Sequence, residues 1–201
     1  MKKTLIIGTT NPAKIAQLKD SLSSIDVLVT GFPPGTKLPE IAEDGKTVQE
    51  NARKKAVAYA KAIGQTVFSM DNALFIDGLS PEKQPGIYVR RIGGVLAVSD
   101  EELLEHAISL IQSLGGTASG YWEFGVCIAH HNGTLFETTI RTSRFFTSKA
   151  SQKKIPGYPL ASIQIDPKSE KYISEMTTNE RALFYQSTIG IPLCSFVKSV
   201  L

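Results

Sequence analysis

A lone carboxylate inside an apolar segment is the residue best placed to do chemistry in this sequence. Asp71 follows the mostly apolar residues 66–70 and precedes Asn72 and the apolar residues 73–76. Residues 66–70 predict a strand that ends at Asp71, and open α/β sheets bind ligands at the carboxyl ends of strands. Because a carboxylate leaving a buried strand needs cations or donors, we expect a functional role. A tight Asp-Asn turn is the alternative.

An acidic loop at residues 38–45, Leu-Pro-Glu-Ile-Ala-Glu-Asp-Gly, offers metal ligands. Mg²⁺ takes few protein carboxylates and completes its octahedron with water and substrate phosphates. Asp71 and one acid of this loop would therefore suffice. Glu40, Glu43 and Asp44 all stay open as that second ligand, and simple solvation of the loop is the alternative.

A small polar turn at residues 7–14, Ile-Gly-Thr-Thr-Asn-Pro-Ala-Lys, is a candidate phosphate site. It predicts a strand, a turn and a helix N-terminus, whose free backbone N–H groups favour phosphate. Thr9, Thr10 and Asn11 can add donors, and Lys14 adds a positive charge. The segment lacks the P-loop pattern. A plain helix cap with a surface lysine is the alternative.

Lys55 is a second candidate for phosphate. Residues 47–63 predict a helix that Thr47 caps, with Glu50 in the capping-box position. Lys55 lies at the margin of the buried stripe of this helix, and Asn51 lies one turn earlier on the same margin. A lysine there either extends to solvent or meets an anion.

The remaining pattern predicts an α/β protein that positions these groups. Strands are expected at 4–8, 26–30, 66–70, 120–131 and 134–147, helices at 12–23, 47–63, 100–114 and 178–186, and loops at 31–46 and 155–160. The early alternation and the later long strands favour one domain over residues 1–201 with two lobes and a cleft between them.

Composition narrows the class of protein. The chain has 201 residues, of which 42% are hydrophobic and 20% charged, so it can build a large core and is not disordered. A net charge of +3 suits a small anion but lacks the basic stripe of a nucleic-acid binder. Cys127 and Cys194 have no metal spacing, so we expect buried thiols in a reducing compartment. Apolar runs are too short for a signal peptide or a membrane span, so we expect a cytoplasmic protein without membrane partners.

Four ordered segments resemble motifs of the inosine triphosphate pyrophosphatase family, whose members hydrolyse non-standard purine nucleoside triphosphates. The family's Thr-Gly-Asn-x-x-Lys corresponds to residues 9–14, its Thr-Phe-Glu-Glu-Asn-Ala-x-x-Lys-Ala to 47–56, its Ala-Asp-Asp-Ser-Gly-Leu to 69–74, and its Pro-Gly-Val-Tyr-Ser-Ala-Arg to 85–91. The resemblance covers most of the chain. It implies an elongated mixed α/β sheet, two lobes around a central nucleotide cleft, and a homodimer.

The same resemblance assigns roles to individual residues. Asp71 becomes the catalytic acid that binds Mg²⁺ and helps to activate water, with Glu40 or Glu43 as the second metal ligand. The implied substrate contacts are Thr9, Thr10, Asn11, Lys14, Lys55, Asn72, Tyr158, Arg181 and Gln186.

Three places depart from the family pattern. Met70 replaces the first Asp of the Asp-Asp pair, and the family's Gly-Phe-Gly-Tyr-Asp-Pro loop is Ile-Pro-Gly-Tyr-Pro-Leu at residues 155–160. In the late Glu-Lys-x-Ala-x-Ser-His-Arg motif, Arg181 replaces the lysine, and Gln186-Ser187 replaces the base-reading His-Arg pair. An amide both donates and accepts, whereas His and Arg chiefly donate. We therefore expect weaker discrimination between inosine and standard triphosphates, or a shifted preference.

Two hypotheses of function follow. The leading one is a Mg²⁺-dependent hydrolase that converts nucleoside triphosphates to nucleoside monophosphate and pyrophosphate. The alternative is a catalytically impaired protein of the same fold that binds or senses a nucleotide. The departures favour the alternative, while retention of Asp71 and Lys55 favours the enzyme.

Overall fold

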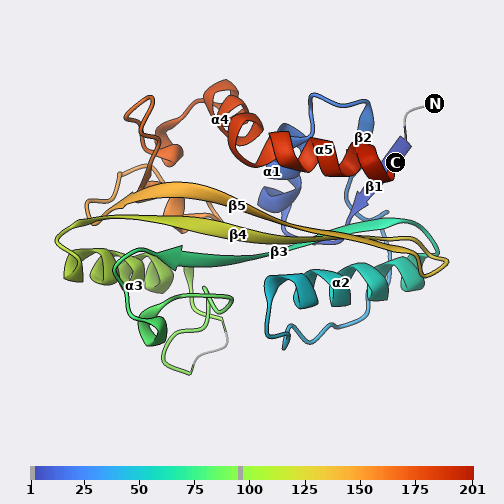
Figure 1. Cartoon of the computed structure of the whole chain (residues 1–201), viewed down its shortest axis with the longest axis horizontal. Coiled ribbons are helices and arrows are strands. Elements are labelled where there is room, and N and C mark those ends of the chain that lie inside the picture. The colour runs from blue at the N-terminus through green and yellow to red at the C-terminus, as the bar shows by residue number, and fades with distance from the viewer. Residues whose placement is uncertain (1–2, 95–96) are drawn as a thin grey trace. The chain divides into compact units, whose positions relative to one another are not determined.

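The structure is a computed structural model that describes residues 3–94 and 97–201 (Figure 1). Its sheet has the strand order β2-β1-β3-β4-β5-β6. The strands are β1 (Lys3–Ile7), β2 (Val27–Thr30), β3 (Val67–Ile76), β4 (Thr117–Ala129), β5 (Leu135–Thr147) and β6 (Gln164–Ile165). The α-helices are α1 (Pro12–Ser21), α2 (Val48–Ile63), α3 (Asp100–Ser113), α4 (Thr178–Tyr185) and α5 (Ile191–Val200), and a π-helical segment spans Gln186–Gly190.

The chain forms two compact units. Unit 1 comprises Met1–Asn72, Glu123–Arg141 and Ala182–Leu201, and unit 2 comprises Ala73–Trp122 and Thr142–Arg181. Strands β3, β4 and β5 contribute residues to both units. The organisation as one domain with two lobes around a nucleotide cleft stays a prediction.

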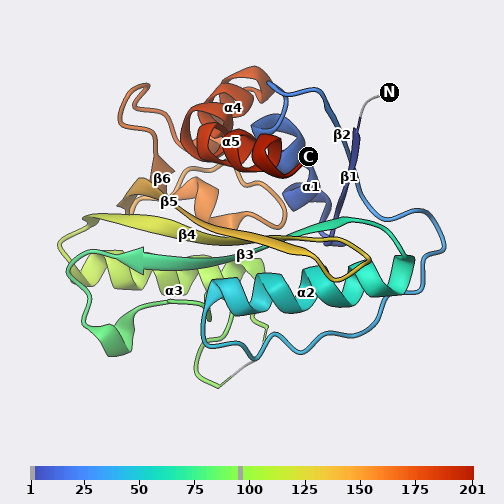
Figure 2. The same cartoon turned by 45° about the vertical axis from the view of Figure 1, so that its right-hand side comes forward.

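Unit 1 is built around the parallel strands β1, β2 and β3. Leu5 of β1 pairs with Val29, and Ile7 pairs with Phe68 of β3. Helix α2 covers one face of this part of the sheet, and α1 and α5 lie on the other (Figures 1 and 2). Helix α2 packs closely against β4, because a Cβ at Gly125 of β4 would lie 2.4 Å from the carbonyl carbon of Val48. Gly125 on the strand, and the buried alanines of α2, therefore let the helix approach the sheet closely.

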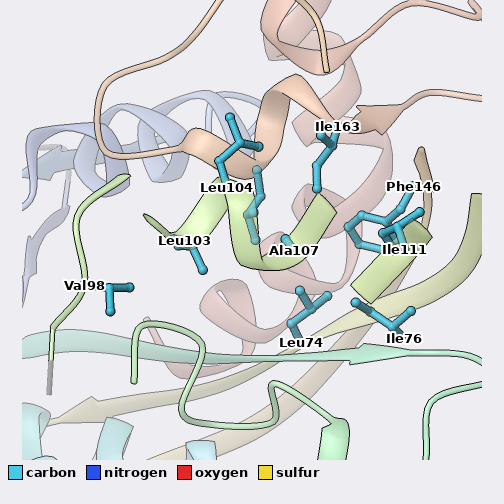
Figure 3. Close-up of a cluster of buried hydrophobic side chains, with 10 residues drawn as sticks. Leu74, Ile76, Val98, Leu103, Leu104, Ala107, Ile111, Phe146 and Ile163 are labelled. Atoms are coloured by element: carbon cyan, nitrogen blue, oxygen red, sulfur yellow. The ribbon is translucent and has the colours of Figure 1, made fainter. Parts of the chain in front are cut away.

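Unit 2 has its own hydrophobic core around α3. Helix α3 begins with a capping box formed by Ser99 and Glu102. Its apolar side packs against strand and loop residues of the same unit (Figure 3). The cluster includes Leu74, Ile76, Val98, Leu103, Leu104, Ala107, Ile111, Phe146, Leu160 and Ile163. Ile111 and Phe146 are fully buried, and each such side chain contributes about 1.5–3 kcal/mol.

Most predicted elements lie within a few residues of their expected bounds, but one expectation was wrong and one helix was not predicted. Strand β3 does not end at Asp71 but continues to Ile76, so Asp71-Asn72 is not a turn. Helix α5 follows the π-helical segment directly and was not predicted. Both cysteines are buried free thiols, and burial raises the pKa of Cys127 to about 12. In the described residues, no helix has the length and apolar character needed to span a membrane.

Candidate functional site

Asp71 lies in the middle of β3, just beyond the end of the neighbouring strand β1. Strand β1 ends at Ile7, opposite Phe68, where the Gly8 N–H donates to the Phe68 carbonyl oxygen at 2.6 Å. Asp71 follows three residues later, about 10 Å further along β3. Asp71 therefore lies beyond the carboxyl end of β1, and not at the carboxyl end of its own strand as expected.

Helix α2 supplies both hydrogen-bond partners of the Asp71 carboxylate, and the Asp71 side chain is only 9% exposed. Lys55 Nζ donates to Asp71 Oδ1 at 3.0 Å, and Asn51 Nδ2 donates to Asp71 Oδ2 at 3.0 Å. The two α2 residues are four apart, so they project from the same side of the helix. This pairing explains why a charged residue can lie inside a buried strand without ending it.

Asn51 also ties the acidic loop to the helix. Its Oδ1 accepts a hydrogen bond from the Gly45 N–H at 2.8 Å, so both ends of the amide are used and its orientation is fixed. A Cβ at Gly45 would lie 2.5 Å from that oxygen, which is closer than side chains pack. From the sequence, Asn51 was expected only to lie one helical turn before Lys55. That four-residue spacing was the available signal that Asn51 contacts the same carboxylate as Lys55.

The helix cap forms largely as predicted. The Thr47 hydroxyl oxygen accepts a hydrogen bond from the Glu50 N–H at 3.1 Å. The Glu50 carboxylate accepts from the Lys46 N–H at 2.7 Å, instead of from the Thr47 N–H expected of a capping box. Two successive residues, Gly45 at the end of the acidic loop and Lys46 after it, are therefore hydrogen-bonded to side chains at the start of α2.

The structure separates the two candidate glutamates. Glu43 Oε2 lies 3.3 Å from Lys55 Nζ, so one ammonium group joins Glu43 and Asp71. The Lys55 side chain is 8% exposed, whereas that of Glu43 is 46% exposed and faces solvent. Glu40 is exposed and has no ion pair with the described residues. The geometry thus places Glu43, and not Glu40, beside the buried carboxylate.

The Asp71–Glu43 pair is suited to Mg²⁺. Within residues 3–94 and 97–201, no group of three His, Cys, Asp or Glu side chains could hold a metal ion. Mg²⁺ does not need one, because substrate phosphates and water complete its octahedron. Two carboxylates from separate segments already share one cation here, the Lys55 ammonium. The residues present therefore fit a hard divalent cation bound jointly with a polyphosphate.

The Thr9–Lys14 turn follows β1 and begins α1, as predicted, but its amides are not all free. Asn11 is the N-cap, and its Oδ1 accepts from the Ala13 and Lys14 N–H groups at 2.9 and 3.4 Å. The Thr9 hydroxyl oxygen accepts from the Asn11 N–H at 3.2 Å. The expected free donors at the helix start are therefore satisfied within the turn, because a capping asparagine binds them first.

Ser69 is a polar residue near the site that sequence analysis did not identify. It is fully buried, and its hydroxyl has no hydrogen-bond partner in the described residues. A Cβ at Gly8 would lie 2.1 Å from this oxygen, so any side chain at position 8 would force the Ser69 hydroxyl to move. Ser69 and Asp71 are two apart on β3 and share one face of the strand.

Gln186 has a fixed orientation within unit 1. Its Nε2 donates to Ser23 Oγ at 2.7 Å. The Ser23 hydroxyl donates its single hydrogen to the Asp20 carbonyl oxygen at 2.8 Å, so toward Gln186 it can only accept. The amide therefore directs its nitrogen to Ser23 and keeps Oε1 as an acceptor.

Tyr158 and Arg181 belong to unit 2. The loop that carries Tyr158 is held by Asp100 of α3, whose Oδ2 accepts from the Gly157 N–H at 2.8 Å. Arg90 Nη2 donates to Asp100 Oδ1 at 2.7 Å and to the Gly157 carbonyl oxygen at 3.4 Å. Burial opposes ionisation of Asp100, but these hydrogen bonds outweigh it and lower its pKa.

The structure thus brings three predicted residues together: Asp71, Lys55 and Glu43. Thr9, Thr10, Asn11, Lys14, Asn72 and Gln186 lie in the same unit. Asn72 follows Asp71 on β3, so its side chain points to the opposite face of the strand.

Comparisons with known sequences agree with this arrangement. A model of the Ham1 family matches residues 5–184. A dITP/XTP pyrophosphatase from Exiguobacterium sp. is 30% identical over 181 residues, which cover 89% of this chain and 88% of that protein. A dITP/XTP pyrophosphatase from Nitratidesulfovibrio vulgaris is 38% identical over 90 residues, but this match spans only 45% of this chain and 42% of that protein.

Solved structures match over nearly the whole chain. The Staphylococcus aureus Ham1 protein has a TM-score of 0.71 and 23% identity, with 99% of this chain and all (100%) of that chain covered. A HAM1 protein from Coxiella burnetii has a TM-score of 0.73 and 18% identity, with 98% and 99% covered. These likenesses confirm the mixed α/β fold, and the sequence matches confirm the resemblance. The chain belongs to the Ham1 family.

Proposed function

We propose that this protein is a nucleoside triphosphate pyrophosphatase that uses Mg²⁺ to convert non-standard purine nucleoside triphosphates to nucleoside monophosphate and pyrophosphate. The observation that carries the proposal is the buried Asp71 carboxylate, joined through Lys55 to Glu43. The substrate class is supported by relatives named dITP/XTP pyrophosphatase.

In this proposal Asp71 and Glu43 hold the metal, and Asp71 also accepts the proton of the water that attacks the α-phosphorus. When bound, Mg²⁺ supplies charge neutralisation for the phosphate oxygens. Asn51 holds the Asp71 carboxylate in one orientation through a 3.0 Å hydrogen bond. Such preorganisation lowers the reorganisation needed during reaction.

The phosphate contacts are assigned by family resemblance and by charge. Lys55 and Lys14 supply positive charge in unit 1, together with the donors Thr9, Thr10 and Asn11. Asn72 is assigned by the resemblance alone, since its side chain lies on the opposite face of β3 from Asp71. Arg181 would add a further phosphate cation, with Tyr158 and Gln186 as substrate contacts. A homodimer and a cytoplasmic location are part of the same proposal.

A binder without catalysis is the second candidate, and one observation favours it. Met70 is 7% exposed and takes the position of the first acid in the family's Asp-Asp pair. A buried thioether cannot replace a carboxylate as a metal ligand or a base. Asp71 would then have to be both the proton acceptor and, with Glu43, a metal ligand.

A turnover assay separates the two candidates. Pyrophosphate and orthophosphate release is measured with Mg²⁺ over dITP, XTP, ITP, ATP and GTP, beside thermal-shift titrations with the same nucleotides. The enzyme predicts pyrophosphate release with dITP, XTP or ITP. Thermal stabilisation without turnover of any of them would reject the enzyme and favour the binder.

A further inference from the structure

We propose that Lys55 occupies the metal site in the nucleotide-free protein, so that Mg²⁺ enters only together with a triphosphate that draws the lysine away. This inference rests on the proposed function, because it concerns the same carboxylates. It assigns to Lys55 a regulatory role toward the metal in addition to its expected phosphate contact.

The position of the Lys55 ammonium carries the inference. It lies 3.0 Å from Asp71 Oδ1 and 3.3 Å from Glu43 Oε2, the oxygens that fit the cation. Mg²⁺ binds its oxygen ligands at about 2.0–2.1 Å. The ion would have to lie between the same two oxygens, where the ammonium now lies. Both cations cannot use them together, because like charges at such short range repel strongly.

Burial makes this competition effective. The Lys55 and Asp71 side chains are 8% and 9% exposed, so water screens their attraction poorly. In the described structure, Lys55 has these two carboxylates as its only ion-pair partners. A metal ion that binds without nucleotide provides no anion for the displaced ammonium group. A metal–triphosphate complex does provide one, because its phosphates can pair with the lysine as the ion takes the place of the ammonium group.

The consequence is coupling between metal and nucleotide. In the metal-competent state, Lys55 has left the two carboxylates. If only a small fraction of the free protein is in this state, the apparent dissociation constant of the metal rises by the inverse of that fraction. Nucleotide then strengthens metal binding, and by linkage metal strengthens nucleotide binding equally. The site would stay closed to free Mg²⁺ until substrate arrives.

The test measures binding of Mn²⁺, as a probe for the metal, to the nucleotide-free full-length protein by electron paramagnetic resonance. Removing the ammonium with Lys55→Met should tighten Mn²⁺ binding by about tenfold or more. Lys54→Met is the matched control. It removes the same charge from α2, but Lys54 pairs with Asp44 on the exposed side. We expect Lys54→Met to bind Mn²⁺ like the wild type.

Two further measurements test whether the gain in Mn²⁺ affinity arises at the Asp71–Glu43 site. In the Lys55→Met background, Glu43→Gln should remove the gain in affinity, whereas Glu40→Gln should leave it. Adding a non-hydrolysable α,β-imido inosine triphosphate should tighten Mn²⁺ binding to the wild type more than to Lys55→Met. Lys55→Gln, which can still donate to Asp71, serves as a second variant if the methionine unfolds the chain.

The inference is overturned if folded Lys55→Met and Lys55→Gln bind Mn²⁺ no more tightly than Lys54→Met. Because the measurement needs no turnover, the two proposals fail separately. Normal pyrophosphate release without the affinity gain would reject only the lysine's regulatory role. The affinity gain without any pyrophosphate release would reject only the enzymatic activity.

Discussion

At the scale of single residues, a serine hydroxyl decides what Gln186 offers to a ligand. The Ser23 hydroxyl donates to the Asp20 carbonyl oxygen and must accept from Gln186 Nε2, so Gln186 presents Oε1. A 6-oxopurine such as inosine carries hydrogen on N1 and can donate to that oxygen, whereas N1 of adenine is an acceptor. If Gln186 contacts the base, this orientation favours a base whose N1 donates, which is the shifted preference that the sequence leaves open.

We predict that kcat/KM for inosine triphosphate exceeds that for adenosine triphosphate by about tenfold or more if Oε1 faces N1 of the base, because two acceptors would then oppose each other in the adenine complex, and adenine could pair with Oε1 only by shifting its 6-amino group toward it. Ser23→Ala frees the amide to rotate and should reduce this ratio severalfold, and Gln186→Ala should reduce it at least as much. Ser24→Ala is the control, because its hydroxyl contacts Cys194 Sγ instead. An unchanged ratio in Gln186→Ala would place base recognition elsewhere.

At the scale of elements, the outer side of α2 is fastened to β4 and β5 within unit 1. Arg53 Nε and Nη2 each donate to the Glu137 carboxylate at 2.8 Å. Gln49 Nε2 donates to Glu137 at 2.8 Å and to the Val126 carbonyl oxygen at 3.0 Å. Because α2 carries Asn51 and Lys55, this clamp positions the helix that holds Asp71.

The clamp predicts a pH dependence of stability. Burial raises the pKa of Glu137, but hydrogen bonds from Arg53 and Gln49 outweigh this and lower it below 4.5. A lowered folded-state pKa gives stability that is present above the ordinary value and lost as pH falls through the folded one. The pair is partly exposed, so the effect is about 0.2–1 kcal/mol.

Thermal unfolding between pH 7 and pH 3 checks this prediction. The difference in stability between wild type and Glu137→Gln should be constant near neutral pH and shrink below about pH 4.5. Glu105→Gln on α3 controls for removal of an exposed glutamate. Parallel curves for wild type and Glu137→Gln down to pH 3 would contradict the prediction.

The loop that carries Tyr158 depends on α3 in unit 2. Asp100 accepts from Gly157 and Arg90, and Arg90 also donates to the Gly157 carbonyl oxygen. We predict that Asp100→Ala releases this loop, because it removes two hydrogen bonds and leaves Arg90 without its carboxylate. Trypsin should then cleave after Lys153 and Lys154, which are exposed, severalfold faster. The control is Glu101→Ala in the same helical turn, and equal cleavage rates would contradict the prediction.

At the scale of the whole molecule, sequence periodicity predicted the elements but not how a charge could be buried. Helices α1, α2, α3 and α4 follow spacing and capping rules that act locally. Strand β3 was predicted to end at Asp71, because a single sequence does not reveal that Asn51 and Lys55 satisfy the carboxylate. The continuation of that strand depends on tertiary contacts.

In the candidate site, too, the sequence predicted the residue types but not their contacts. Residue types and motifs predicted that Asp71 and Lys55 act together, whereas the contact of Lys55 with Glu43 depends on the fold of the acidic loop. The occupied amides at Ala13 and Lys14 and the orientation of Gln186 are likewise set by atoms at hydrogen-bond distance. Sequence spacing cannot fix these contacts.

We propose above that Asp71 is the catalytic carboxylate of a pyrophosphatase. The most direct test of this role compares pyrophosphate release from inosine triphosphate by the wild type, Asp71→Asn and Asp44→Asn. Asp44 is an exposed acid of the acidic loop at residues 38–45 and serves as the control. Because the Asp71–Lys55 pair is buried, its loss costs about 3–5 kcal/mol, so thermal unfolding must first show that Asp71→Asn is folded.

We predict that folded Asp71→Asn loses about 10²–10⁴-fold in kcat, since it lacks both a metal ligand and a proton acceptor. Asp44→Asn should stay within about threefold of the wild type, as expected for an exposed surface charge. Release of pyrophosphate by folded Asp71→Asn at a rate close to that of Asp44→Asn would contradict the assignment of the site.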